Sequence, residues 1–334
     1  MKKKNRFLKK QHSWTLILIL LMSLSTAYTL LDAFVIPRLY IVAAQSQAAD
    51  TIVVVPHENE DLESVNLTAT DLSEEIGISA SNDMEVFNQS DPIITDNSYK
   101  DDIISINIEK VSENGVEFYV ADIQIKDISY LQTAFAYDTY GKNITQTTSE
   151  MAEANDAIFA INGDYYGFRD TGLVIRNGQL YRDVFNNNTY DQSLTIDRNG
   201  NFAVVDDSQI SGTDLIDAGI LQSFSFGPVL VENGQIISYD DTQLASKTNP
   251  RTAIGQISAL HYIFIVVDGR SATSKGMTLT QLAQEFFDRG ATIAYNLDGG
   301  GSSAIWLNGN LINNPTDGKR TGERKISDII YIGY

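Results

Sequence analysis

The chain has 334 residues, which is long enough for one large domain or two small ones, and its composition is that of a globular protein. Its formal net charge of -19 at pH 7 argues against a nucleic-acid partner, because contact with phosphate backbones requires a basic face. The absence of cysteine excludes disulfides, thiolate nucleophiles, zinc ribbons and iron–sulfur sites.

The N-terminus pairs a basic tail with an apolar run. Residues 1–13 carry Lys and Arg but no acid, and residues 14–36 are largely apolar. About 20 apolar residues suffice for a bilayer-spanning helix, and the basic flank directs the N-terminus to the cytoplasm. A cleaved signal peptide is the alternative, although its apolar region usually has only about 7–15 residues. We therefore predict a signal-anchor helix at 14–36 that holds a single-pass chain in the cell membrane, with the C-terminal domain extracytoplasmic.

An acidic stretch follows. Residues 50–102 hold 14 Asp and Glu against a single lysine, Lys100, and their only aromatic residues are Phe87 and Tyr99. Such a segment cannot bury enough apolar surface to offset the entropy of ordering. Residues 37–102 are therefore predicted to be an acidic, disordered linker, with an acidic cation-binding tail as the alternative.

Beyond the linker the pattern changes to short strands and tight turns. Residues 103–108 and 116–125 flank Asn114-Gly115, a dipeptide that favours a two-stranded hairpin. The same dipeptide recurs between β-rich runs at 177–178, 199–200, 233–234 and 308–309. Residues 103–334 are thus predicted to form one domain that is dense in hairpins.

The clearest helix lies between two strands. Residues 261–267 and 291–297 are rich in β-branched, aromatic and apolar types, as buried strands are. Between them Thr278 and Gln281 form a capping box, apolar residues follow at helical spacing, and Gly290 stands where a helix ends. This order predicts a right-handed crossover with parallel strands. The predicted fold is a single mixed domain, part α+β and part α/β, with a mixed sheet rich in hairpins and one βαβ crossover.

Carboxylates follow the predicted strands. Asp268 and Asp298 each come directly after one strand of the crossover, so parallel strands would bring both to one sheet edge, where α/β sheets bind ligands. An earlier strand-like run ends in Asn162, Gly163 and Asp164 and would join the same edge if it ran parallel. Carboxylate pairs perform acid–base or nucleophilic work on glycosidic bonds. A divalent cation is the alternative, but no EF-hand spacing is present, so we expect neither a metal nor a cofactor.

Three glycines and two serines follow Asp298. Consecutive glycines are kept where backbone approaches another group closely or adopts positive φ, and their amides can form an anion-binding nest; a tight turn is the alternative. Arg251 and Arg270 are candidates to clamp a phosphate against this nest, with structural ion pairs as the alternative for each. Histidine contributes little, because His261 is expected to be a structural strand-end residue. The predicted binding residues are Asn162, Gly163, Arg251, Arg270, Gly299, Gly300, Gly301, Ser302 and Ser303.

Seven segments carry a resemblance to a known family. They are Ala160–Tyr166, Gly172–Gly178, Phe226–Leu230, Pro250–Gly255, Val266–Arg270, Gly276–Thr278 and Asn296–Ser302. In this order they resemble the phosphodiester glycosidases, across about residues 150–334, and the first 100 residues lie outside the resemblance. Asp164 departs from the family pattern, because many members have glycine there and paired phenylalanines where this chain has Tyr165 and Tyr166.

The resemblance implies hydrolysis of a sugar-1-phosphate diester, such as a GlcNAc-1-phosphodiester glycan, an envelope polysaccharide or a teichoic acid decoration. A phosphate ester is a good leaving group, so charge neutralisation matters more than a strong general acid. Asp298 is the candidate base or nucleophile and Asp268 its partner carboxylate, although the two could exchange roles, and Asp164 is a third candidate. The candidates to bind sugar hydroxyls or phosphate oxygens are Asn162, Ser302 and Ser303.

Two other functions stay open at this point. A non-catalytic polysaccharide-binding module of the cell envelope would show saturable binding without turnover. An exopolysaccharide-assembly transferase would form product only with an acceptor sugar present. The carboxylate-rich edge favours an enzyme over a binder, and nothing in the sequence separates a hydrolase from a transferase.

Overall fold

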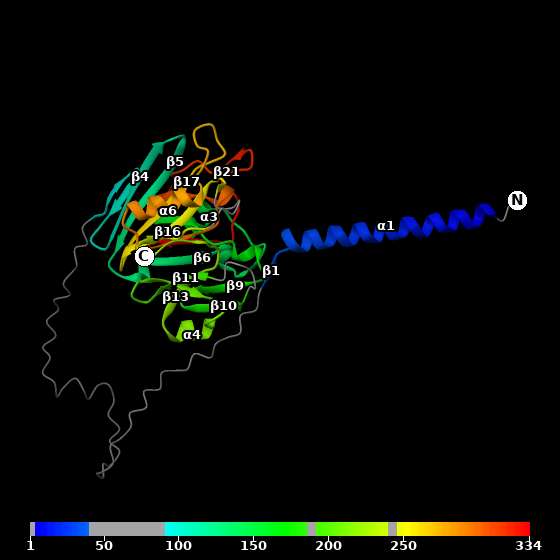
Figure 1. Cartoon of the computed structure of the whole chain (residues 1–334), viewed down its shortest axis with the longest axis horizontal. Coiled ribbons are helices and arrows are strands. Elements are labelled where there is room, and N and C mark those ends of the chain that lie inside the picture. Colours follow the sequence, from blue (N-terminus) through cyan, green and yellow to red (C-terminus); the bar gives the residue numbers. More distant parts are fainter. Residues whose placement is uncertain (1–3, 40–90, 186–191, 240–245) are drawn as a thin grey trace, which may run out of the picture. The chain divides into compact units, whose positions relative to one another are not determined.

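The computed structural model describes residues 4–39, 91–185, 192–239 and 246–334 (Figure 1). α1 (Lys4–Phe34) includes most of the run predicted as a signal anchor. Among the described residues, no helix is both long enough and apolar enough to cross a membrane. Most of the predicted linker, residues 40–90, lies outside the described part of the chain.

The larger of two main sheets has nine strands in the order β15-β14-β18-β16-β17-β5-β4-β3-β2. Every hydrogen-bonded pair in it is antiparallel. In chain order its strands are β2 (Ile93–Thr95), β3 (Ser98–Lys100), β4 (Ile104–Glu113), β5 (Val116–Ile125), β14 (Val229–Glu232), β15 (Gln235–Ile236), β16 (Arg251–Ser258), β17 (His261–Val267) and β18 (Ile293–Asn296).

The smaller main sheet has five antiparallel strands in the order β20-β19-β8-β23-β6. In chain order they are β6 (Leu131–Phe135), β8 (Phe159–Asn162), β19 (Ile305–Leu307), β20 (Asn310–Leu311) and β23 (Asp328–Ile332). The remaining strands form small ladders: β1 (Arg38–Leu39) with β7 (Gly141–Lys142), β9 (Gly172–Arg176) with β10 (Gln179–Val184), β11 (Gln192–Asp197) with β12 (Phe202–Asp206) and β13 (Ile220–Phe224), and β21 (Thr316–Asp317) with β22 (Arg320–Thr321).

The main core lies between the two large sheets. Ile106 and Phe264 of the nine-stranded sheet share one buried cluster with Phe159 and Ile330 of the five-stranded sheet. On the outer face of the larger sheet, α6 (Leu279–Asp288) buries apolar residues against it. On the outer face of the smaller sheet, α3 (Thr148–Ala154) does the same. The layers are therefore α6, the nine-stranded sheet, the five-stranded sheet and α3.

Several local predictions are confirmed. β4 and β5 form the expected hairpin, and Asn114 and Gly115 at its turn have φ of 52° and 72°. The capping box of α6 is complete, since the Thr278 hydroxyl accepts the Gln281 N–H and the Gln281 side chain accepts the Thr278 N–H. Gly290 has a φ of +78° just after this helix. Each feature depends on residues close in sequence, which is why the sequence predicts them.

The crossover prediction is correct in direction and wrong in pairing. β17 and β18 run the same way, but β16 lies between them and is antiparallel to both. Among the described residues the two main sheets contain no parallel ladder, so the predicted mixed sheet is instead antiparallel. The hairpin partner β16 occupies the place that a parallel neighbour would take. β17 and β18 nevertheless end at the same edge, as their direction requires.

The predicted linker, which ends at residue 102, extends too far along the chain, because the folded domain begins before that residue. β2 and β3 fall inside the predicted linker and extend the nine-stranded sheet. Tyr99 is only 7% exposed and belongs to the main core. The Asp101 carboxylate accepts the backbone N–H groups of Ile103 and Ile104, both at 2.7 Å. One buried aromatic and one carboxylate cap thus order a segment whose average composition predicts disorder.

We expect fragment 91–334 to unfold with a free energy about 2–4 kcal/mol larger than fragment 103–334, because the shorter fragment loses the buried Tyr99 ring and the Asp101 cap. Urea unfolding followed by circular dichroism measures the difference. Tyr99→Ala in the longer fragment should reproduce most of the loss. Equal midpoints for the two fragments would show that β2 and β3 contribute nothing.

Candidate active site

The candidate site lies where the two main sheets meet. Asn162, at the end of β8, donates its side-chain amide to the Asp298 carbonyl at 2.7 Å. Its side-chain oxygen accepts the hydroxyl of Thr252 from β16, also at 2.7 Å. All three side chains are buried, so Asn162 fixes the residue that follows β18 to both sheets at once. The structure thereby places Asn162 beside Asp298, as predicted.

Asp298 combines burial with nearby positive charge. Its side chain is 9% exposed, and its Oδ1 accepts the Gly299 N–H at 2.9 Å. Burial raises the pKa of the Asp298 carboxyl. A hydrogen bond from the Ser302 side chain, followed by the positive charges of Arg324 and Arg169, opposes that shift in part. A carboxylate in such a setting is suited to act as a base or a nucleophile.

The glycine run does provide a close approach. A Cβ at Gly299 would lie 2.8 Å from the Pro250 carbonyl oxygen, and Gly300 has a φ of +68°. The predicted anion nest, however, is wrong for most of its amides. The Gly300 N–H donates to the Pro250 carbonyl, and those of Ser302 and Ser303 donate back to the glycines in a short 3₁₀ turn. With these donors occupied, charge for an anion must come from side chains.

Arg270 is well placed to supply that charge. Its guanidinium nitrogens lie 3.2–3.3 Å from where a Cβ on Gly300 would be, so the glycine makes room for it. Among the described residues Arg270 forms no ion pair, and its Nη2 donates to the Asn249 side-chain oxygen at 3.2 Å. The Asp317 carboxylate is near, since the pKa of Asp317 is lowered by its hydrogen bond to Arg324 and, more weakly, by the charge of Arg270. Arg270 also has a φ of +56°, an uncommon backbone state for a side chain of this size and one that gathers at functional sites.

Arg251 lies near Arg270, and its side chain is hydrogen-bonded to the backbone. Its Nε donates to the Met277 carbonyl and its Nη2 to the Lys247 carbonyl. Burial, followed by the positive charge of Arg270, lowers the pKa of Arg251 to about 10. The two predicted arginines therefore do come together, and Arg270 is the less engaged of the two, since it uses one N–H donor and Arg251 uses two.

Asp268 lies at the same sheet edge but is engaged elsewhere. It is 3% exposed, and its carboxylate accepts the Asn313 side-chain amide at 2.8 Å and the Asn314 N–H. The same Asn313 amide donates to the Ser303 carbonyl. This placement indicates that Asp268 holds the turn after Asp298 in position. A reacting role beside Asp298, as predicted, has no supporting contact in the described residues.

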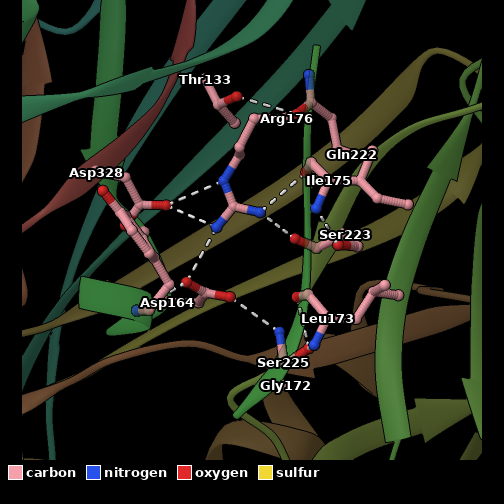
Figure 2. Close-up of polar contacts among 12 residues, drawn as sticks. Thr133, Asp164, Gly172, Leu173, Ile175, Arg176, Gln222, Ser223, Ser225 and Asp328 are labelled. Atoms are coloured by element: carbon pink, nitrogen blue, oxygen red, sulfur yellow. Dashed lines mark hydrogen bonds and ion pairs between the residues drawn. The ribbon is translucent and has the colours of Figure 1, made fainter. Parts of the chain in front are cut away.

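Asp164 belongs to a buried ionic cluster with Arg176 and Asp328 (Figure 2). Arg176 Nη2 lies 3.0 Å from Asp164 Oδ1 and 2.7 Å from Asp328 Oδ2. Asp164 Oδ2 also accepts the Ser225 N–H at 2.9 Å. A Cβ on Gly163 would collide with the Asp328 carboxylate, so this glycine is required by close approach. The structure therefore corrects the prediction for Asp164 and Gly163: both serve the cluster, since a buried arginine needs carboxylate partners.

Two arginines near Asp298, Arg169 and Arg324, are not predicted from the sequence. Arg324 donates its N–H to the Gly301 carbonyl and pairs with Asp317 at 2.7 Å. Arg169 lies with its guanidinium 4.9 Å from the Phe226 ring centre. Neither follows a strand or belongs to a recognisable motif, so no sequence signal places it at the site.

Two buried polar atoms near the turn lack a partner among the described residues, Asn296 Oδ1 and Ser303 Oγ. Asn296 is 2% exposed, stands two positions before Asp298, and donates its amide to the Gly227 carbonyl. Buried polar atoms are nearly always paired, so such atoms point to a missing hydrogen-bonding group.

The family model of the phosphodiester glycosidases matches residues 155–333, more than half of the chain. The chain belongs to the phosphodiester glycosidase family. The matched span contains the strand ends, arginines and turn described above. The family that the seven segments resemble is therefore confirmed.

Individual relatives are similar over different lengths. The SPbeta prophage-derived uncharacterized protein YomE of Bacillus subtilis (strain 168) is 29% identical over an alignment of 309 residues that covers 86% of this chain and 46% of that protein. Human N-acetylglucosamine-1-phosphodiester alpha-N-acetylglucosaminidase is 24% identical over 192 residues, which are 51% of this chain and 36% of that protein. The chain thus spans less than half the length of these curated relatives.

A solved structure shows the same fold. The catalytic domain of zebrafish N-acetylglucosamine-1-phosphodiester alpha-N-acetylglucosaminidase, auto-inhibited by its pro-peptide, superimposes with a TM-score of 0.55. The match has 23% sequence identity and covers 69% of this chain and 83% of that one. At this identity the match supports the fold of the phosphodiester glycosidase domain.

We expect the buried cluster to make stability depend on pH. Burial raises the pKa of Asp328 from 3.8 to about 6, and the charge of Asp164 adds to the shift while Arg176 opposes it. Because the folded state then holds the proton more tightly, the contribution of this group is largest below pH 3.8 and is lost as pH rises to about 6. The loss should be about 1–3 kcal/mol.

Asp328→Asn, which is neutral at every pH, should flatten this dependence. Urea unfolding from pH 4 to 7 compares the variant with the parent and with Asp102→Asn, a substitution at an exposed position. Parallel stability curves for the parent and Asp328→Asn would contradict the assignment.

Proposed function

We propose that the domain hydrolyses a sugar-1-phosphate diester, releasing the sugar and leaving phosphate on the acceptor. The observation that carries the proposal is the buried Asp298 carboxylate with the charges of Arg324 and Arg169 acting on it and the Arg270 guanidinium against Gly300, in a chain of net charge -19. Positive charge at this site offsets the repulsion between an anionic substrate and an acidic chain, and it can neutralise a phosphate leaving group. The name of the human relative, N-acetylglucosamine-1-phosphodiester alpha-N-acetylglucosaminidase, supports the same chemistry.

The proposed reaction breaks the bond between the anomeric carbon and the phosphate oxygen. Water supplies the new hydroxyl on the sugar, and the electron pair of the broken bond leaves with the phosphate. Asp298 either takes the proton of the attacking water or attacks the anomeric carbon itself, forming a glycosyl ester that water then hydrolyses. Arg270 stabilises the charge that develops on the departing phosphate.

The substrate proposed is an α-GlcNAc-1-phosphodiester or a similarly decorated envelope polysaccharide or teichoic acid. A transferase would use the same geometry with an acceptor hydroxyl in place of water. A polysaccharide-binding module is disfavoured by a buried carboxylate, because desolvating an ionisable group helps a reaction more than it helps binding of a neutral glycan.

Asp298→Asn should lower kcat for GlcNAc-α-1-phospho-methylmannoside by about 10³-fold or more, because it removes the base or nucleophile and keeps the shape. The measurement is the rate at which the full chain releases free GlcNAc from this substrate. Asp122→Asn on the outer face of β5, where Asp122 is 46% exposed, is the matched control. Full activity of Asp298→Asn would overturn the assignment, and saturable binding with no turnover by the parent would favour the binding module.

The pH profile gives an independent check. Ionised Asp298 is the active form, and its pKa lies above the ordinary 3.8, so kcat/KM should fall on the acid side at a pH above 3.8. Arg324→Gln removes an opposing positive charge and should move this acid limb to higher pH. An acid limb that does not respond to Arg324→Gln would argue against Asp298 as the titrating group.

We also propose that the domain acts outside the cytoplasm, held at the cell membrane by residues 14–36. The basic residues of 1–13 and the apolar composition of 14–36 support this. Deletion of residues 1–36 should move the chain from the membrane pellet to the supernatant after cell lysis and ultracentrifugation. Recovery of the intact full chain in the supernatant would reject the anchor.

A further inference from the structure

Arg169 is held in place by aromatic rings. Its guanidinium lies 4.9 Å from the ring centre of Phe226 and 5.7 Å from that of Tyr165, within the range of cation–π attraction. Phe168 stacks on Tyr165 with ring centres 4.7 Å apart and supports this arrangement. Arg169 Nη1 donates to the Ser225 carbonyl, which is its only hydrogen-bond acceptor among the described residues. A guanidinium carries five N–H donors, so most of them remain available.

The loop that carries Phe226 is tied to the strand that ends in Asp298. Asn296 of β18 donates its side-chain amide to the Gly227 carbonyl at 2.8 Å, and its N–H to the Pro228 carbonyl at 3.1 Å. At the other end of this loop, the Ser225 N–H donates to the buried Asp164 carboxylate. Arg169 is thereby fixed relative to Asp298 through rigid, buried contacts.

Tyr165 adds a sign of function. It has a φ of +67°, an uncommon and costly state for an aromatic residue. Strain of this kind persists where the surroundings over-determine it, and it gathers at sites that hold a ligand. Here the strained residue contributes one of the two rings that face the guanidinium.

The four arginines around the turn fall into two groups. Arg324 pairs with Asp317, and two nitrogens of Arg251 donate to carbonyls of the fold. Arg169 and Arg270 have no carboxylate partner among the described residues. Of these two, Arg169 is half-buried and Arg270 is exposed. A half-buried cation that is held in place without an ion pair, as Arg169 is, is suited to receive an anion from a ligand.

We propose that Arg169, held against the rings of Tyr165 and Phe226, binds the phosphate of the substrate and makes the site selective for phosphate-linked sugars over neutral glycosides. This assignment rests on the proposed function and names the residue that binds the charged group of the substrate.

The test compares two substrates on the full chain. GlcNAc-α-1-phospho-methylmannoside carries the phosphate, and p-nitrophenyl α-GlcNAc does not. Arg169→Gln should lower kcat/KM about 100-fold on the first substrate and less than about 3-fold on the second. Arg169→Lys, which keeps the charge without the planar fork, should fall between Arg169→Gln and the parent. Arg198→Gln, at an exposed arginine, is the matched control.

Equal losses on both substrates would show that Arg169 only supports the fold, and unchanged rates would show that it has no part in catalysis. A binding arm separates this proposal from the proposed function. If the parent turns over neither substrate, the proposed function fails, and calorimetric binding of α-GlcNAc-1-phosphate decides the role of Arg169. Binding that Arg169→Gln weakens at least tenfold, with GlcNAc alone unaffected, supports the assignment; equal binding, or no binding by the parent, overturns it.

Discussion

The buried amide of Asn162 is the contact on which the candidate site depends. It joins the end of a strand in the five-stranded sheet to Thr252 in the nine-stranded sheet and to the backbone of Asp298. Both hydrogen-bonding ends of the amide are used, and an amide deprived of either partner in this interior would cost free energy. One side chain therefore links both sheets to the backbone of the candidate catalytic carboxylate.

The chain uses arginines in two distinct ways. Arg176 is surrounded by Asp164 and Asp328, so its charge is more than balanced and it serves to join β9 and β23 to the loop after β8. Arg169 and Arg270 have no such partners among the described residues, and they lie beside the turn that follows Asp298. A protein of net charge -19 that leaves positive charge unpaired at one place creates a local preference for an anion there.

Much of the fold follows from short-range sequence signals. Asn114-Gly115 sets a hairpin turn because these residues readily adopt positive φ, and Thr278 with Gln281 caps α6 because both ends of the box lie within one turn. The common direction of β17 and β18 follows from the connection between them. The ordered hairpin of β2 and β3 did not follow, because its stability depends on Tyr99 reaching a core built by distant strands.

At the candidate site, some features follow from the sequence alone and others depend on tertiary contacts. The sequence by itself determined the family, the hairpins, the helix caps and the candidacy of Asp298, since these depend on residue type and local spacing. It could not tell Asp164 and Asp268 from Asp298, because each is an aspartate beside a glycine after a strand. Only tertiary structure decided their partners. Asp164 forms an ion pair with Arg176, and Asp268 accepts hydrogen bonds from Asn313 and Asn314. Asp298 instead lies near the charges of Arg169 and Arg324. These partners are far away in sequence, and the pairing of charges depends on distance in space.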